Sequence, residues 1–100
     1  MKTISKEAWN RVIEKACDVA NATQVEDDPM YEIHRQQMIE ILDELEAEYG
    51  ENSRIYDTRA DYVDDPIESR RLSMKALELA KEQNDQDEIK IIQQSLRDLE

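Results

Sequence analysis

Residues 27–52 read DDPMYEIHRQQMIEILDELEAEYGEN, a stretch that holds the signals for both ends of a long helix and most of the chain's charge. A proline directly after Asp28 is typical of the first position of a helix, and Gly50 suits the left-handed residue that follows the last turn. The stretch therefore predicts a helix from Pro29 to about Tyr49. Its nine acids and one base give a net charge of −8, whereas the whole chain carries −12.

The predicted helix is amphipathic, because its apolar residues recur at helical spacing. The inner positions are Met30, Met38, Ile41, Leu42, Leu45 and Tyr49, with His34 among them. The opposite stripe reads Glu32, Gln36, Ile39, Asp43 and Glu46. An isoleucine within a charged rim is a small version of the anatomy of a protein interface.

The composition favours an all-α fold of about five antiparallel helices. The chain has 100 residues, one glycine and two prolines, so it offers little turn chemistry for β-hairpins, while good helix formers dominate. This length is typical of one domain with a modest core, and we expect residues 1–100 to form a single α-helical domain.

Four further helices are predicted from apolar periodicity and capping residues. They cover about Ser5–Asn21 with Thr3 or Ser5 as cap, about Ser53–Val63 with Asn52 or Ser53 as cap, Asp65-Pro66 to Asn84, and Asp85 to about Leu99. The predicted inner positions of the first are Trp9, Val12, Ile13, Ala16, Val19 and Ala20, and those of the second are Ile55, Tyr56, Ala60 and Val63. Those of the third are Leu72, Ala76, Leu77, Leu79 and Ala80, and those of the last are Ile89, Ile92, Leu96 and Leu99.

The motif Asp-Asp-Pro at residues 27–29 recurs at residues 64–66, a spacing of 37 residues. Each copy opens a helix that follows another amphipathic helix, so the chain reads as two helical hairpins and a final helix. Short polar connections predict antiparallel neighbours, either in a repeat array or in a simple helical bundle.

Residues 73–81, SMKALELAK, followed by Asn84-Asp85, resemble the second helix of a tetratricopeptide repeat and the start of the next repeat. The resemblance covers about residues 53–99 and places the small residue of that helix at Ala76. The tryptophan and glycine of the family's first helix are missing, and Ser73 stands where a large aromatic is expected. The resemblance implies a right-handed array of antiparallel helices that binds protein.

Composition also bears on partners and location. Nucleic-acid binding relies on basic side chains, so an acidic chain is not expected to bind nucleic acid. No apolar run has the length needed to span a bilayer, and the first residues lack the apolar core of a signal peptide. The single cysteine, Cys17, fits a reducing compartment and is expected to be a buried small hydrophobe. We therefore expect a cytoplasmic protein without membrane contact.

We expect no enzymatic activity, metal or cofactor. The only histidine, His34, has Glu32 two residues before it, which is not the Glu-x-x-His spacing of di-iron helical proteins. Its place on an apolar stripe favours a hydrogen-bonded core or groove histidine. A small hydrolase or metal-dependent enzyme is the alternative class, which metal analysis would test.

The acids of residues 27–52 crowd the end of their helix, where the macrodipole disfavours negative charge. Solvation of an exposed face and pairing with bases of the fourth helix are the two structural explanations, but four bases cannot neutralise nine acids. We favour binding of a basic protein, with the chain acting as a neutralising partner of the immunity-protein or antitoxin type. The expected partner-binding residues are Glu32, Ile39, Glu40, Asp43, Glu44 and Glu46.

Two alternatives of other kinds stay open at the level of sequence. A tetratricopeptide-like adaptor or chaperone would hold a peptide in a groove near His34 or Tyr62. The outward apolar residues Ile67 and Met74 are either packed by the last helix or form the face of a homodimer.

Overall fold

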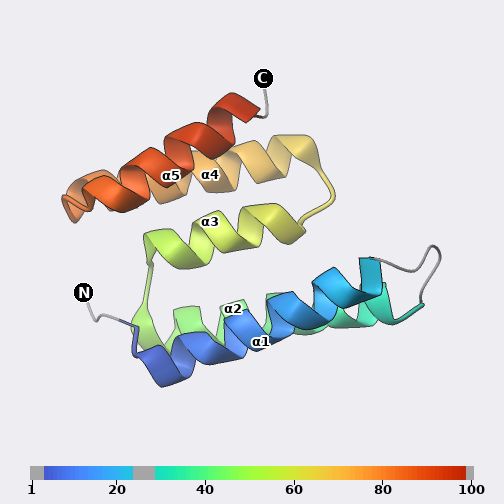
Figure 1. Ribbon diagram of the computed structural model, residues 1–100. Helices are drawn as coiled ribbons and strands as arrows, with labels where there is room; N and C mark the ends of the chain where they lie inside the picture. Colours follow the sequence, from blue (N-terminus) through green and yellow to red (C-terminus); the bar gives the residue numbers. More distant parts are fainter. Residues whose placement is uncertain (1–3, 24–28, 99–100) are drawn as a thin grey trace. The chain divides into compact units, whose positions relative to one another are not determined.

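A computed structural model describes residues 4–23 and 29–98, and this part of the chain is all-α, as predicted. Its five helices are α1 (Lys6–Thr23), α2 (Pro29–Tyr49), α3 (Ser53–Tyr62), α4 (Pro66–Glu82) and α5 (Gln86–Asp98) (Figure 1). The chain divides into two units, one built from α1 and α2 and the other from α3, α4 and α5. Within each unit, consecutive helices pack as antiparallel hairpins.

The ends of α1 and α2 follow the predicted signals. The Ala8 N–H donates to Ser5 Oγ at 3.1 Å, so Ser5 caps α1, while the alternative cap, Thr3, lies outside the described residues. Helix α2 begins at Pro29, and its expected cap, Asp28, also lies outside the described residues. Gly50 follows α2 with φ at +81°, the left-handed conformation that a glycine adopts without strain.

The inner face of α1 is centred on Val12, Val19 and Ala22, which are buried. The expectation that Ile13 and Ala20 are inner positions is wrong, because Ile13 is 52% exposed and Ala20 is also exposed. Successive residues of a helix turn by about 100°, so these two side chains lie about a quarter of a turn from the buried line.

Cys17 corrects a second expectation, because its side chain is exposed rather than buried. It lies five residues after Val12, which places it about 140° around α1 from the buried line. Cys17 therefore lies outside the apolar face that packs against α2.

The inner face of α2 is formed by Met38, Leu42 and Leu45, each almost completely buried. Ile41 and Tyr49 are half-buried, as suits the edge of this face. Met30 was expected inside but is 43% exposed. It lies in the first turn of α2 and about 80° around the helix from Met38, so it falls at the margin of the packed surface.

In the second unit, side chains cap the helices at the predicted positions. Asn52 Oδ1 accepts from the Arg54 N–H at 2.9 Å, and Asp65 Oδ1 accepts from the Ile67 N–H at 3.0 Å, directly before Pro66 at the first position of α4. Each such cap stabilises its helix by about 1 kcal/mol.

The turn between α4 and α5 uses two adjacent polar residues. Asn84 is left-handed, with φ at 55°, and its N–H bonds the Lys81 carbonyl at 3.1 Å while the Asp85 N–H bonds the Ala80 carbonyl at 3.0 Å. These two bonds form the Schellman motif that closes a helix. Asp85 Oδ1 then accepts from the Glu88 N–H at 3.1 Å and so caps α5.

The core of the second unit lies between α4 and α5. Ala76, Ala80 and Ile92 are completely buried, and alanine at two facing positions lets the helices approach closely. Half-buried side chains pack around this cluster from all three helices: Tyr56, Leu77, Ile89 and Leu96. The predicted inner residue Leu99 lies outside the described residues.

Two apolar residues of α4 are left outside this core. Ile67 is 80% exposed and Met74 is 50% exposed, so α5 does not pack them, and that alternative from the sequence is excluded. None of the described helices is long and apolar enough to cross a membrane.

Adjacent isoleucines on α5 provide a matched test of this core. Ile92→Ala should lower the free energy of unfolding by about 2–4 kcal/mol, because it leaves a cavity beside Ala76 and Ala80. Ile91→Ala should change it by less than about 0.5 kcal/mol, since Ile91 is exposed. Urea unfolding followed by far-ultraviolet circular dichroism measures both, and equal losses would contradict the described packing.

Candidate functional site

The charged surface of α2 has a definite centre. Glu40 lies two residues from Met38, about 200° around the helix, and so faces almost directly away from the buried residues. The residues that surround it are also exposed. We call this surface the outward face of α2, and it consists of Ile33, Gln36, Glu40, Asp43, Glu44 and Ala47.

The six residues expected to bind a partner do not share one face. Glu40, Asp43 and Glu44 belong to the outward face of α2, and Glu32 is exposed beside it. Ile39 and Glu46 are half-buried on the flank of the helix. The structure therefore brings three of the six residues together and places the other three along one side.

Ile33 is the isoleucine that α2 exposes, with 48% of its surface accessible, and the sequence interpretation did not select it. Measured from the buried trio Met38, Leu42 and Leu45, Ile33 falls on the opposite side of the helix. The periodicity already places Ile33 opposite this trio, whereas the sequence interpretation took Ile39 as the centre of the outward stripe.

The carboxylates of α2 stand close to one another, and the helix has a single base, Arg35, which pairs with Glu32. Glu40, Glu44 and Glu48 are spaced four residues apart, the spacing at which side chains on a helix are neighbours, and like charges there repel. The last turn of α2 contains no base. Both features act against the stability of the helix.

Some of these acids have partners within their own unit. Glu44 forms an ion pair with Arg11 of α1, which the sequence interpretation did not foresee. Glu32 accepts from Arg35 Nε at 3.1 Å, and this hydrogen bond holds the pKa of Glu32 below its ordinary value. Both acids are exposed, and exposed pairs contribute little to stability.

The bases of α4 have their own pairs. Lys75 Nζ lies 3.4 Å from Glu51 Oε2, and Arg71 pairs with Glu68 of the same helix. Bases of α4 were expected to pair with acids of residues 27–52, and the pair between Lys75 and Glu51 is an example that is present.

His34 is part of a polar contact between α1 and α2. Lys15 Nζ lies 2.7 Å from Gln37 Oε1, 3.3 Å from His34 Nδ1 and 3.3 Å from Asp18 Oδ2. Since an ammonium only donates, Nδ1 of His34 is the acceptor in its contact with Lys15. This contact gives the half-buried His34 a structural role in joining the two helices.

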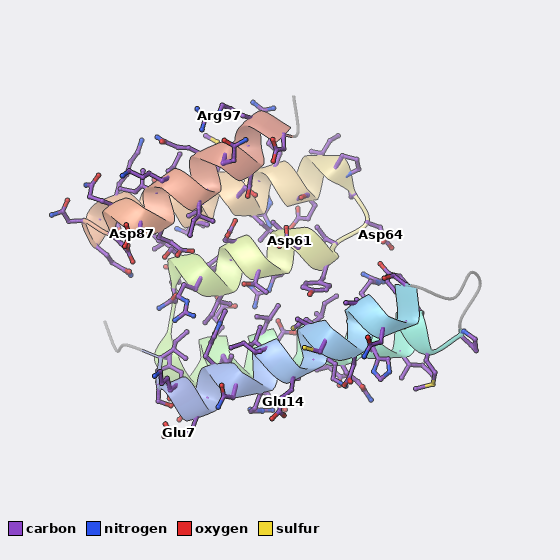
Figure 2. All side chains as sticks on the ribbon, in the orientation of Figure 1. Glu7, Glu14, Asp61, Asp64, Asp87 and Arg97 are labelled. Atoms are coloured by element: carbon purple, nitrogen blue, oxygen red, sulfur yellow. The ribbon has the colours of Figure 1, made fainter. Side chains whose placement is uncertain are left out.

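The second unit contains a group of carboxyls whose ionisation is perturbed. Burial, together with the carboxylates of Asp61 and Glu88, raises the pKa of Asp57 from 3.8 to about 6. Loss of hydration raises the pKa of Asp61, which Figure 2 shows on α3. Burial and the nearby Asp85 raise the pKa of Glu88, and Arg54 opposes this change. The sequence interpretation missed this group because it joins α3 to α5.

These acids do not form a metal centre. Among residues 4–23 and 29–98, no group of three or more His, Cys, Asp or Glu side chains is arranged to hold a metal ion. The carboxyls of Asp57, Asp61 and Glu88 offer negative charge and groups that can exchange protons. This group contains no nucleophile paired with a base.

No protein-family model matches the chain, and neither a curated protein nor a solved structure gives a significant match.

The raised pKa of Asp57 predicts a pH dependence of stability. Between pH 3.8 and about 6 the folded state holds a proton that the unfolded chain releases, so this group's contribution to stability falls as the pH rises through that window and stays low above it. The side chain introduced by Asp57→Asn does not ionise, so the variant does not lose this contribution to stability as the pH rises. After allowance for solvent screening of the half-buried group, the variant should gain about 1 kcal/mol at pH 7.5 and much less at pH 4.

Urea unfolding at the two pH values measures this effect. Glu78→Gln is the matched control, because it removes an exposed carboxylate from α4 and should change the midpoint little at either pH. A gain for Asp57→Asn that is the same at both pH values would contradict the raised pKa.

Proposed function

We propose that this chain is a non-enzymatic acidic protein-binding domain whose partner is a basic protein. The outward face of α2 makes the contact. The observation that carries the proposal is the exposure of Glu40, Asp43 and Glu44 on one side of a rigid helix, with the exposed Ile33 beside them.

Stability alone does not account for this surface. Repulsion along Glu40, Glu44 and Glu48 costs a few tenths of a kcal/mol for each neighbouring pair, and carboxylates near the end of α2 oppose its dipole. The ion pair between Glu44 and Arg11 offsets part of this cost. A basic partner lowers the repulsion further by bringing positive charge to these carboxylates.

The contact has the two components of a specific interface. Exposed carboxylates attract a basic surface over long range and so raise the association rate. Ile33 adds exposed apolar surface that is buried when the partner binds. Occupation of a basic cleft by such a helix excludes the anionic substrate of that cleft. The chain then acts as a neutralising partner, of the immunity-protein or antitoxin type, of an enzyme with a basic active site.

A tetratricopeptide-like peptide-binding adaptor is the second candidate. Successive antiparallel packing of α3, α4 and α5, with the small residues Ala76 and Ala80 at the α4–α5 contact, favours it. In that case a short peptide suffices for binding, and Tyr62 matters more than the outward face of α2.

Charge reversal on α2 separates these candidates. Glu40→Lys with Asp43→Lys should abolish capture of a basic protein from cell lysate and slow association with the purified partner at least tenfold at low salt, because it removes the attraction that steers the encounter. The control, Glu7→Lys with Glu14→Lys, makes the same change in net charge on α1 (Figure 2).

Mass spectrometry of the captured proteins and stopped-flow association rates are the measurements. The control should retain the partner with a much smaller change in rate. Equal rates for both double variants would show that only net charge matters, and an unchanged rate for the α2 variant would overturn the proposed surface.

A further inference from the structure

The side of α4 that faces away from its core differs in charge from the rest of the molecule. Ile67 and Met74, seven residues apart, lie on the side opposite Ala76, and both are exposed. Bases surround them on the same side. We call this surface the outward face of α4, and it consists of Ile67, Arg70, Arg71, Met74, Glu78, Lys81 and Glu82, all exposed.

This face is basic in a strongly acidic chain. Its three bases outnumber its two acids, Glu78 and Glu82, whereas the whole chain carries a net charge of −12. Arg71 pairs with Glu68 at its edge but stays exposed. Two exposed apolar side chains framed by bases have the composition of a contact surface for an acidic, partly apolar partner.

The outward face of α2 has the complementary composition. It combines the exposed Ile33 with Glu40, Asp43 and Glu44, and it includes no base. Each of the two faces spans at least two turns of a straight helix, so their lengths are compatible.

We propose that the outward face of α4 docks on the outward face of α2 of a second copy of this chain. Carboxylates of α2 meet bases of α4, and Ile33 contacts Met74 or Ile67 across the interface. The contact joins two different surfaces, so two copies either make it twice around a twofold axis and close a dimer, or make it once and leave one α2 face and one α4 face for further copies.

The strength of this contact is limited by the net charge. Two copies at −12 repel each other over the Debye length, so the dissociation constant is expected to be micromolar or weaker. A basic protein bound at the outward face of α2 competes with the second copy. The self-association itself does not depend on the proposed function, and either proposal can fail alone.

Two charge-reversal variants, each unable to self-associate, test the contact when they are mixed. Arg70→Glu with Lys81→Glu makes both faces acidic, and Glu40→Lys with Asp43→Lys makes both faces basic. Each variant alone should sediment as a monomer at concentrations where the wild type associates. An equimolar mixture should associate again, because the first variant retains a native α2 face and the second a native α4 face.

Sedimentation velocity at two protein concentrations an order of magnitude apart measures this, with circular dichroism to verify folding. Lys90→Glu with Arg97→Glu on α5 and Glu7→Lys with Glu14→Lys on α1 make the same changes in net charge and should associate like the wild type or differ only slightly. If a charge-reversal variant does not fold, Ile67→Ser with Met74→Ser replaces it and should sediment as a monomer.

The proposal is supported if the two charge-reversal variants associate only when they are mixed and if both control variants associate on their own. A wild type that is monomeric at both concentrations overturns it. So does a wild-type oligomer that persists in either α2 or α4 variant, or a mixture that remains monomeric.

Discussion

Each helix of this chain has a single narrow apolar stripe, and that stripe can be removed from water only against another helix. In α2 it is Met38, Leu42 and Leu45, and between α4 and α5 it is Ala76, Ala80 and Ile92. Because the rest of each helix surface is mostly polar, a helix gains most by packing on its neighbour in the sequence, to which a short connection already holds it. The hairpins within each unit follow from this constraint, and so do the caps that end each helix where the chain must turn.

The same constraint decides which residues are available for binding. A narrow buried stripe leaves a wide outward surface, which α2 fills with carboxylates and α4 with bases around two apolar residues. The ion pairs Arg11–Glu44 and Arg71–Glu68 are exposed, and exposed pairs contribute little to stability. The opposite signs of the two surfaces are consistent with two roles: attraction of a basic protein at α2 and attraction between copies through α4.

Local features of the structure could be predicted from the sequence, and relations between helices could not. Gly50, Asn52, Pro66 and Asp85 mark helix ends because capping depends on adjacent backbone groups. The direction of each inner face depends on what packs against it, which explains the errors at Ile13, Met30 and Cys17. For the same reason the sequence indicated an acidic surface on α2 but not Ile33 at its edge, the Arg11–Glu44 pair or the coupling of Asp57 to Glu88.

We propose that the carboxylates of α2 serve binding and not folding. The free energy of unfolding of Glu40→Gln with Glu48→Gln is the measurement that decides this, because both changes keep good helix formers and remove like-charge repulsion along exposed positions. Urea unfolding at neutral pH and low salt should give a free energy equal to that of the wild type or higher by about 0.5 kcal/mol. A loss of more than about 1 kcal/mol would instead show that these acids hold the fold together.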